Sequence, residues 1–267
     1  MAVALAFLKR DFLNTASYRT QFLMQFVGIL FSAATFYFLS QLFGGVVAPQ
    51  LEEYGGNYFS FVLIGIAFSG YMGLSLSSFA SQIREGQVSG TLELMLLGPT
   101  RLSTILLSSS LWDGIMVTFR VIVFLLVGAL IFNTTLGNAN IATALVVLTL
   151  SMTSFAGVGI ISASFVLLLK KGDPVAWVFG SLSSLLAGVY YPISVLPDWL
   201  EPVSRFFPLT YALDAMRLAM LRGYSLYQVR ADIFVMLAFT LILTPLALFV
   251  FRLALKRAKM EGSLTHY

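Results

Sequence analysis

Six long apolar runs, separated by polar segments, organise this chain. Each run approaches or exceeds the roughly 20 apolar residues that a helix needs to cross a bilayer. We therefore expect six transmembrane helices, at residues 21–43, 58–79, 105–132, 141–169, 175–191 and 233–251. The pattern predicts an all-α integral membrane protein, with residues 1–267 forming a single transmembrane domain.

The segment before the first run, residues 1–19, has its own amphipathic pattern. Leu5, Leu8 and Phe12 lie on one helical face, while Lys9 and Asp11 point away from it. This pattern predicts an interfacial helix along the inner leaflet. The alternative is a plain extension of the first span.

Residues 83–103 form a polar segment between the second and third runs. Val88, Leu92 and Leu96 recur every four residues, and Gly98-Pro99 follows as a helix stop. The spacing predicts a short amphipathic helix at a membrane face. Such a helix can lie on the membrane or enter a groove on a partner protein.

Residues 192–231, between the fifth and sixth runs, are divided by four prolines at positions 192, 197, 202 and 208. A helix of about fourteen residues is expected from Thr210 to Gly223, which is too short to cross a bilayer. We therefore predict a re-entrant helical hairpin in the outer leaflet, with Asp214 and Arg217 spaced to pair at i,i+3. The alternative is an amphipathic loop on the outer surface.

Composition supports the membrane assignment and removes several kinds of chemistry. The chain is 58% hydrophobic and 10% charged, with a mean hydropathy of +0.90, whereas soluble domains carry about 25% charged residues. There is no cysteine, and the only histidine is His266. Disulfides, thiolate metal sites, zinc chemistry and histidine catalysis therefore have no credible residues, and we expect no metal site.

The net charge of +4 is an orientation signal rather than a nucleic-acid patch. Basic residues fall at the two termini and in the segments after the second and fourth runs, whereas residues 44–57 and 133–140 hold none. The positive-inside rule then places both termini in the cytoplasm. The last outer segment has four arginines, offset by four acidic residues.

The third run contains Asp113 and Arg120, which share nearly the same helical face but lie about 10 Å apart along the axis. They cannot pair tightly with each other. Each ionised group costs on the order of 2.5–3.5 kcal/mol near the bilayer centre, so a partner or a wet cavity is implied. For Arg120 both a structural partner in another helix and a contact in a transport path stay open.

Two runs carry small residues at every fourth position, a pattern that lets helix backbones approach closely. These residues are Gly65, Ser69, Gly73, Ser77 and Ser81 in the second run and Ala176, Gly180, Ser184 and Gly188 in the fifth. Packing within one subunit and a place beside a dimer seam or conduit are both compatible with the pattern.

The segment after the second run, with Glu85-Gly86, Gly90-Thr91-Leu92-Glu93 and Pro99, resembles the signature of the type-2 ATP-binding-cassette (ABC) exporter permeases. The similarity extends over the whole chain, with an amphipathic entry helix, six spans and the hairpin with Pro208-Leu209-Thr210-Tyr211. In that family the segment between the second and third spans is a coupling helix.

The resemblance implies partners and sites. It implies two permeases, as a homodimer or a related pair, in a prokaryotic plasma (inner) membrane with two separate nucleotide-binding ATPase subunits. ATP and Mg would bind to the ATPase, and this chain would bind no cofactor. The coupling residues would be Glu85, Gly90, Thr91, Leu92, Glu93, Leu96 and Pro99, and the transport-path or gate candidates are Asp113, Arg120, Pro208, Tyr211, Asp214 and Arg217.

The chain has no GxxxxGK[ST] phosphate-binding loop, so the energy for transport must come from a partner or a gradient. An ion-coupled secondary transporter is the alternative from another class, although only the third run is clearly charged. An intramembrane enzyme lacks a histidine or paired carboxylates for acid–base chemistry. The expected cargo is a hydrophobic or amphipathic molecule, drug-like or lipid, moved outward, and a glycan or lipid-linked polysaccharide is the alternative cargo.

Overall fold

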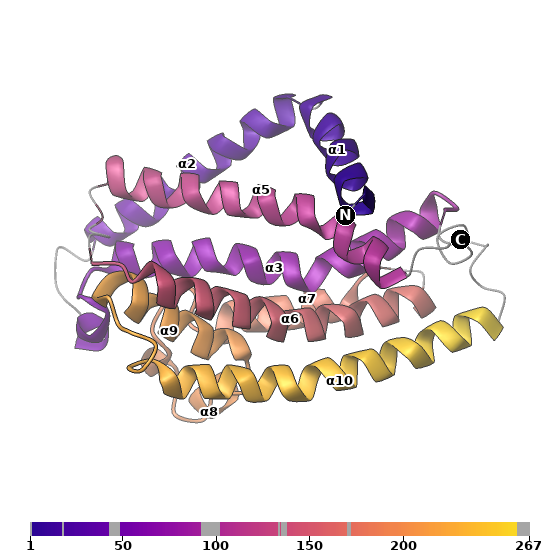
Figure 1. Cartoon of the computed structure of the whole chain (residues 1–267). Helices are drawn as coiled ribbons and strands as arrows, with labels where there is room; N and C mark the ends of the chain where they lie inside the picture. The colour runs from indigo at the N-terminus through magenta and orange to yellow at the C-terminus, as the bar shows by residue number, and fades with distance from the viewer. Residues whose placement is uncertain are drawn as a thin grey trace.

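The computed structural model describes residues 2–17, 19–42, 49–91, 102–132, 134, 138–169 and 172–260, and all regular structure in these segments is helical. The long helices are α1 (Ala2–Ser17), α2 (Arg19–Leu42), α3 (Tyr58–Val88), α5 (Leu102–Leu130), α6 (Ile141–Leu169) and α10 (Arg230–Met260). The shorter elements are η1 (Pro49–Tyr54), α7 (Pro174–Leu186), η2 (Ile193–Val195), α8 (Glu201–Ser204) and α9 (Pro208–Arg222). Figure 1 shows the long helices side by side in one elongated bundle.

Five described helices are long and apolar enough to cross a membrane. They are Met24–Leu42, Tyr58–Val88, Ser110–Leu130, Ile141–Leu169 and Arg230–Ala258, and they match five of the six predicted spans. The chain is an all-α multi-pass membrane protein, as the sequence predicts.

The predicted fifth span, 175–191, differs from a continuous crossing helix. Its helix, α7, has 13 residues and ends at Leu186, which gives a length of roughly 20 Å against a hydrocarbon core of about 30 Å. Gly188 then turns the chain with φ +82°, a conformation that glycine adopts without steric cost. An arrangement of six complete spans therefore stays a prediction.

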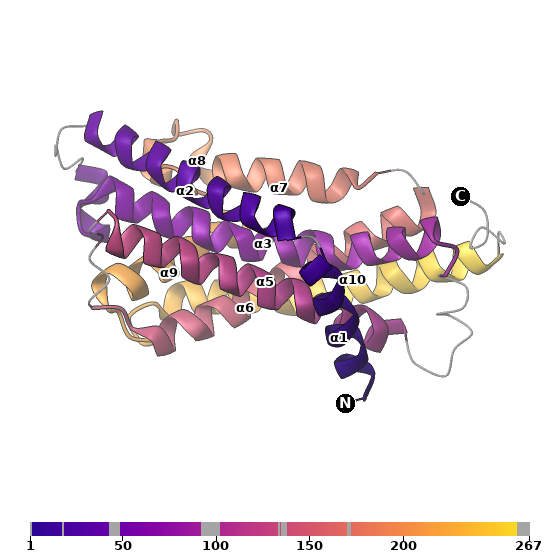
Figure 2. The same cartoon turned by 90° about the horizontal axis from the view of Figure 1, so that it is seen from above.

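Helix α3 is the centre of the bundle, with 72% of its most apolar window buried. It packs against α2, α5, α6, α7 and α9, and α6 packs in turn against α10 (Figures 1 and 2). Helices α2 and α5 run opposite to α3, α6 and α10, so α6 and α10 run in the same direction (Figure 1). The element η1, the end of α5, the start of α6 and the α9–α10 connection share the predicted outer end, and the ends of α3 and α6 share the predicted inner end.

Helix α3 continues nine residues beyond the predicted end of the second span, from Phe79 to Val88. Ile83 is buried in a cluster with Ala163 and Leu167 of α6 and Ala258 of α10, so packing sustains the helix after its hydropathy falls. The prediction that Val88 belongs to a separate amphipathic helix is therefore wrong. Helix α3 ends because Gly90 adopts φ +69°.

Helix α1 lies steeply across the long axis of the bundle (Figure 1). It packs against α5, where the rings of Phe12 and Trp112 meet edge to face at 5.8 Å. Leu5 and Leu13 are exposed beside Lys9. The interfacial position of this helix stays a prediction.

Candidate coupling and transport site

Helix α9 is the main element of the predicted outer hairpin. Pro208 occupies its first turn, where a missing N–H costs nothing, and Gly223 ends it with φ +71°. At 15 residues it is about 22 Å long, so it does not span. It packs against α3, α6 and α10, with Leu209 and Leu213 fully buried. The predicted short helix is therefore present.

Arg217 lies on the buried face of α9 and is only 3% exposed. Its guanidinium donates to three backbone carbonyls: Nε to Phe61 O at 3.2 Å, and Nη2 to Gly188 O at 2.8 Å and Val189 O at 3.0 Å. The Cζ atom lies 3.4 Å from the centroid of the Phe61 ring. Arg217 therefore joins α9 both to α3 and to the turn that follows α7.

Asp214 has a different partner. The Tyr54 hydroxyl of η1 donates to Asp214 Oδ1 at 2.5 Å. Burial raises the pKa of the Tyr54 hydroxyl, and the nearby Asp214 carboxylate raises it further, so the phenol stays protonated and keeps this donor.

The predicted ion pair between Asp214 and Arg217 is wrong. Both residues are described, and no ion pair or hydrogen bond joins them. The reason is that each side chain meets a nearer partner from another element, the Tyr54 hydroxyl for the carboxylate and the carbonyls of α3 and the α7 turn for the guanidinium.

Two small residues make room for Arg217. A Cβ added at Gly65 would lie 2.6 Å from Arg217 Nη2 and would also meet the Val189 carbonyl. Gly188 supplies the positive φ that turns its own carbonyl toward the guanidinium. Of the two small-residue stripes, these two positions therefore have a packing role within one chain. Gly73, in the same stripe of α3, has open space around it.

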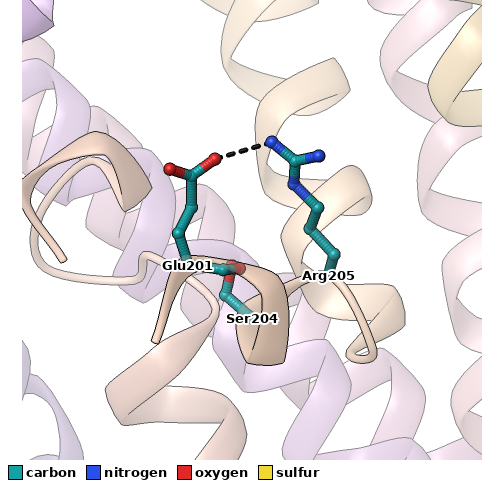
Figure 3. A network of polar contacts seen from close by, with 3 residues as sticks. All are labelled: Glu201, Ser204 and Arg205. Atoms are coloured by element: carbon teal, nitrogen blue, oxygen red, sulfur yellow. Dashed lines mark hydrogen bonds and ion pairs between the residues drawn. The ribbon is translucent and has the colours of Figure 1, made fainter. Parts of the chain in front are cut away.

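The rest of the hairpin is held by local polar contacts. In α8 an exposed ion pair joins Arg205 Nη2 and Glu201 Oε1 at 2.6 Å (Figure 3). The Ser204 hydroxyl donates to Glu201 O, and the Thr210 hydroxyl at the start of α9 donates to Ser204 O. The predicted gate residue Tyr211 is half-buried, with its ring 6.3 Å from that of Phe239 in α10.

The C-terminal end of α9 is also attached to neighbouring segments. Arg222 donates to the backbone carbonyls of Glu52 and Glu53 in η1, and Asn140 N–H donates to Ala219 O. The contact between η1 and the hairpin is not predicted from the sequence. Glu52-Glu53-Tyr54 precedes a Gly55-Gly56 turn, but nothing local in that pattern indicates contacts about 160 residues away.

At the predicted inner end, the described coupling residues are Glu85, Gly90 and Thr91. Glu85 is exposed near the end of α3, and the Thr91 hydroxyl lies 2.8 Å from that of Ser89. The buried Gln87 amide donates to Leu167 O of α6 at 3.3 Å, which links the ends of the two helices. The remaining predicted coupling residues, Leu92, Glu93, Leu96 and Pro99, lie outside the described residues.

In α5, Asp113 is half-buried and Arg120 is exposed. Both are described, and no ion pair joins them, in agreement with their predicted separation along the helix. Arg120 lines a cavity between α2, α3 and α5. A second, mostly apolar groove of about 700 Å³ lies between α3, α5 and α6, lined by Leu74, Leu148 and Met152 among others.

Comparison with known proteins gives a family but no individual relative. No curated protein matches the sequence. The family of ABC-2 type transporters matches residues 3–221, which reach from α1 to the end of α9 and include the coupling segment, Arg120 and most of the hairpin. A match of this length covers most of the 267 residues. The chain therefore belongs to the ABC-2 type transporter family and is a membrane-embedded ABC permease.

Proposed function

We propose that this permease is the transmembrane subunit of an ATP-driven exporter that moves a hydrophobic or amphipathic molecule outward. The family match over residues 3–221 carries the proposal, because an ABC-2 permease works with an ATPase subunit and a membrane. ATP and Mg bind on that subunit. A second permease, identical or related, completes the transport unit.

We propose that the segment 83–103 docks on the ATPase. Its start is held firmly, since Gln87 and Ile83 tie the end of α3 to α6. A movement of the docked segment would therefore be passed to α3, the helix with most neighbours in the bundle. Glu93 supplies a charged anchor and Leu92 an apolar contact.

The test is co-purification of the chain with its ATPase subunit after Glu93→Arg. The expected result is loss of the ATPase from detergent-purified complexes while the permease still inserts, because the reversed charge opposes the anchor. Glu52→Arg makes the same charge change at the predicted outer end and should keep the ATPase bound. Undiminished co-purification and ATP hydrolysis in the Glu93 variant would refute the docking role.

The orientation follows from the same proposal, with both termini in the cytoplasm of a prokaryotic cell and η1 outside. A cysteine replacing the exposed Glu53 should react with an impermeant thiol reagent in intact cells, whereas one replacing the exposed Ser89 should react only after the membrane is opened. Glu53 and Ser89 are preferred to the nearby loop glycines Gly55 and Gly172 as labelling positions, because the positive φ of those glycines disfavours a cysteine. The opposite labelling pattern would reverse the topology.

We further propose that the hairpin from Pro192 to Gly223 forms the exit gate. Its supporting features are the broken fifth helix, the short α9 and the attachment of both to α3 through Arg217. A displacement of α3 that starts at the inner end would reach the hairpin through the Phe61 carbonyl and Gly65. Arg217→Gln should reduce export or uncouple ATP hydrolysis from it while the ATPase still co-purifies. Normal export by this variant at wild-type expression would refute the gate.

A further inference from the structure

A cavity of about 360 Å³ lies between α2, α3 and α5, beside the middle of α5. Three polar side chains line it, Gln25 and Ser32 from α2 and Arg120 from α5. Apolar side chains, including Ile29, Ile66 and Phe124, form the remainder of the wall. The cavity therefore combines one positive charge and two polar groups with an apolar surface.

No hydrogen bond or ion pair in the described part of the chain involves the three polar side chains of this cavity, Gln25, Ser32 and Arg120. Asp113, about two turns away on α5, interacts with Arg120 only at long range. The contrast with other hydroxyls of α2 is clear, since Thr35 and Ser40 donate to carbonyls of the preceding turn. The three groups are thus available to a ligand.

Arg120 lies too far from both ends of α5 for its guanidinium to reach water at the membrane surface. Ten residues separate it from the outer end of α5 at Leu130, a distance of about 15 Å along the axis, and the inner end is farther away. A side chain near the middle of a span cannot extend its charge to the interface, so an ionised guanidinium there needs a counter-charge or a wet cavity. Arginine also stays protonated under all ordinary conditions.

We propose that this cavity binds the anionic group, a phosphate or carboxylate, of an amphipathic molecule. The planar guanidinium of Arg120 matches two oxygens of such a group, and the Gln25 amide and Ser32 hydroxyl add donors from the facing helix. The apolar chain of the same molecule packs on Ile29, Ile66 and Phe124. Its identification as cargo rests on the proposed export function, whereas the binding site itself does not.

Binding of radiolabelled dodecyl phosphate to the full chain in phosphatidylcholine nanodiscs, with empty nanodiscs subtracted, tests the site. No ATPase is present, so a failure here is distinct from a failure of coupling. We expect saturable binding that unlabelled dodecyl phosphate displaces at least about tenfold better than dodecanol, because a charge-assisted contact adds to the shared apolar one. Equal displacement by both compounds, or the absence of saturable binding, would overturn the proposal.

Three variants assign the binding to this cavity. Arg120→Gln should weaken dodecyl phosphate binding about tenfold and remove the preference over dodecanol, while Arg120→Lys should keep part of that preference. Gly28→Leu should weaken binding with the charge intact, because Gly28 lines the cavity and a Cβ there meets open space. Gly73→Leu is the matched control, since Gly73 is equally open but lies outside the cavity, and it should bind as the wild type does. Unchanged binding by Arg120→Gln would refute the site.

A lipid headgroup and a single-chain amphipath share this chemistry, and the nanodisc composition distinguishes them. If phosphatidylglycerol added to the disc displaces dodecyl phosphate from the wild type but has no such effect on residual binding to Arg120→Gln, the natural ligand is a bilayer lipid. If phosphatidylglycerol does not compete, the site selects an amphipath that enters separately, as a cargo would. Both results require the same Arg120-dependent binding.

Discussion

Arg217 and Arg120 both interrupt apolar helices, yet the fold treats them in opposite ways. Arg217 is buried, and three carbonyls from α3 and the α7 turn accept its hydrogen bonds. Arg120 is exposed, lines a cavity and makes no hydrogen bond or ion pair among the described residues. The difference shows that a charge within an apolar helix can either hold the backbone together or stay available for a ligand.

The carbonyls that surround Arg217 also explain why it is tolerated. Helix α7 ends at Leu186, so the carbonyls of Gly188 and Val189 lack the partners that a continuing helix would supply. A buried guanidinium has five donors and supplies those partners. The break in α7 and the burial of Arg217 are therefore two parts of one arrangement.

The largest loss of stability is expected from Arg217→Gln, which removes the buried guanidinium. Three charge-assisted hydrogen bonds and the contact with the Phe61 ring are lost, so we expect a destabilisation on the order of 3–6 kcal/mol. Thermal unfolding of the detergent-purified protein measures it. Arg205→Gln removes an exposed, ion-paired arginine and should cost less than about 1 kcal/mol. Equal unfolding midpoints for the two variants would contradict the anchoring role.

A smaller loss of stability is expected from Gly65→Ala, which keeps the Arg217 side chain but places a methyl group beside its guanidinium. The new Cβ would meet the backbone carbonyl oxygen of Val189 most closely and would lie 2.6 Å from Arg217 Nη2, so both the α7 turn and the guanidinium must shift, at a cost of about 1–3 kcal/mol. Gly73→Ala in the same helix meets nothing and should stabilise slightly through helix propensity. The cost of Gly65→Ala should shrink in an Arg217→Gln background, as measured by a double-mutant cycle. If the free-energy changes of the two substitutions are strictly additive, Gly65 does not make room for Arg217.

The sequence predicts the long helices well because their apolar runs are set by the bilayer thickness. The helix α6, residues Ile141–Leu169, matches its predicted bounds, and α2, α5 and α10 match within a few residues or one turn at most ends. Three departures are larger. Tertiary packing extends α3 past Phe79 and α10 past Phe251, and the Gly188 turn shortens α7. None of these effects is visible in local hydropathy.

The candidate site is less predictable from the sequence. The spacing of Asp214 and Arg217 indicates an i,i+3 pair, but their actual partners come from η1, α3 and the α7 turn. Contacts between residues 28 or more positions apart are set by how the helices pack. The open position of Arg120 is closer to expectation, since the sequence already requires a partner or a wet cavity for it.

The smallest of the three losses of stability is expected from Tyr54→Phe, which tests the hydrogen bond to Asp214 of α9. It leaves the half-buried Asp214 carboxylate without its hydroxyl donor, at a cost on the order of 1–2 kcal/mol. Tyr227→Phe removes a hydroxyl from an exposed ring and should be close to neutral. The measurement is again the unfolding midpoint. An unchanged midpoint for Tyr54→Phe would mean that η1 does not stabilise α9 through this bond.

The two arginines are compared most directly by unfolding Arg217→Gln and Arg120→Gln with and without dodecyl phosphate. A ligand that binds the folded state raises the midpoint of every protein that retains its site. We predict a low midpoint for Arg217→Gln that dodecyl phosphate still raises, and a near-wild-type midpoint for Arg120→Gln that it does not raise. Similar losses of stability in both variants, with equal responses to dodecyl phosphate, would contradict the assignment of Arg217 to the fold and Arg120 to a ligand.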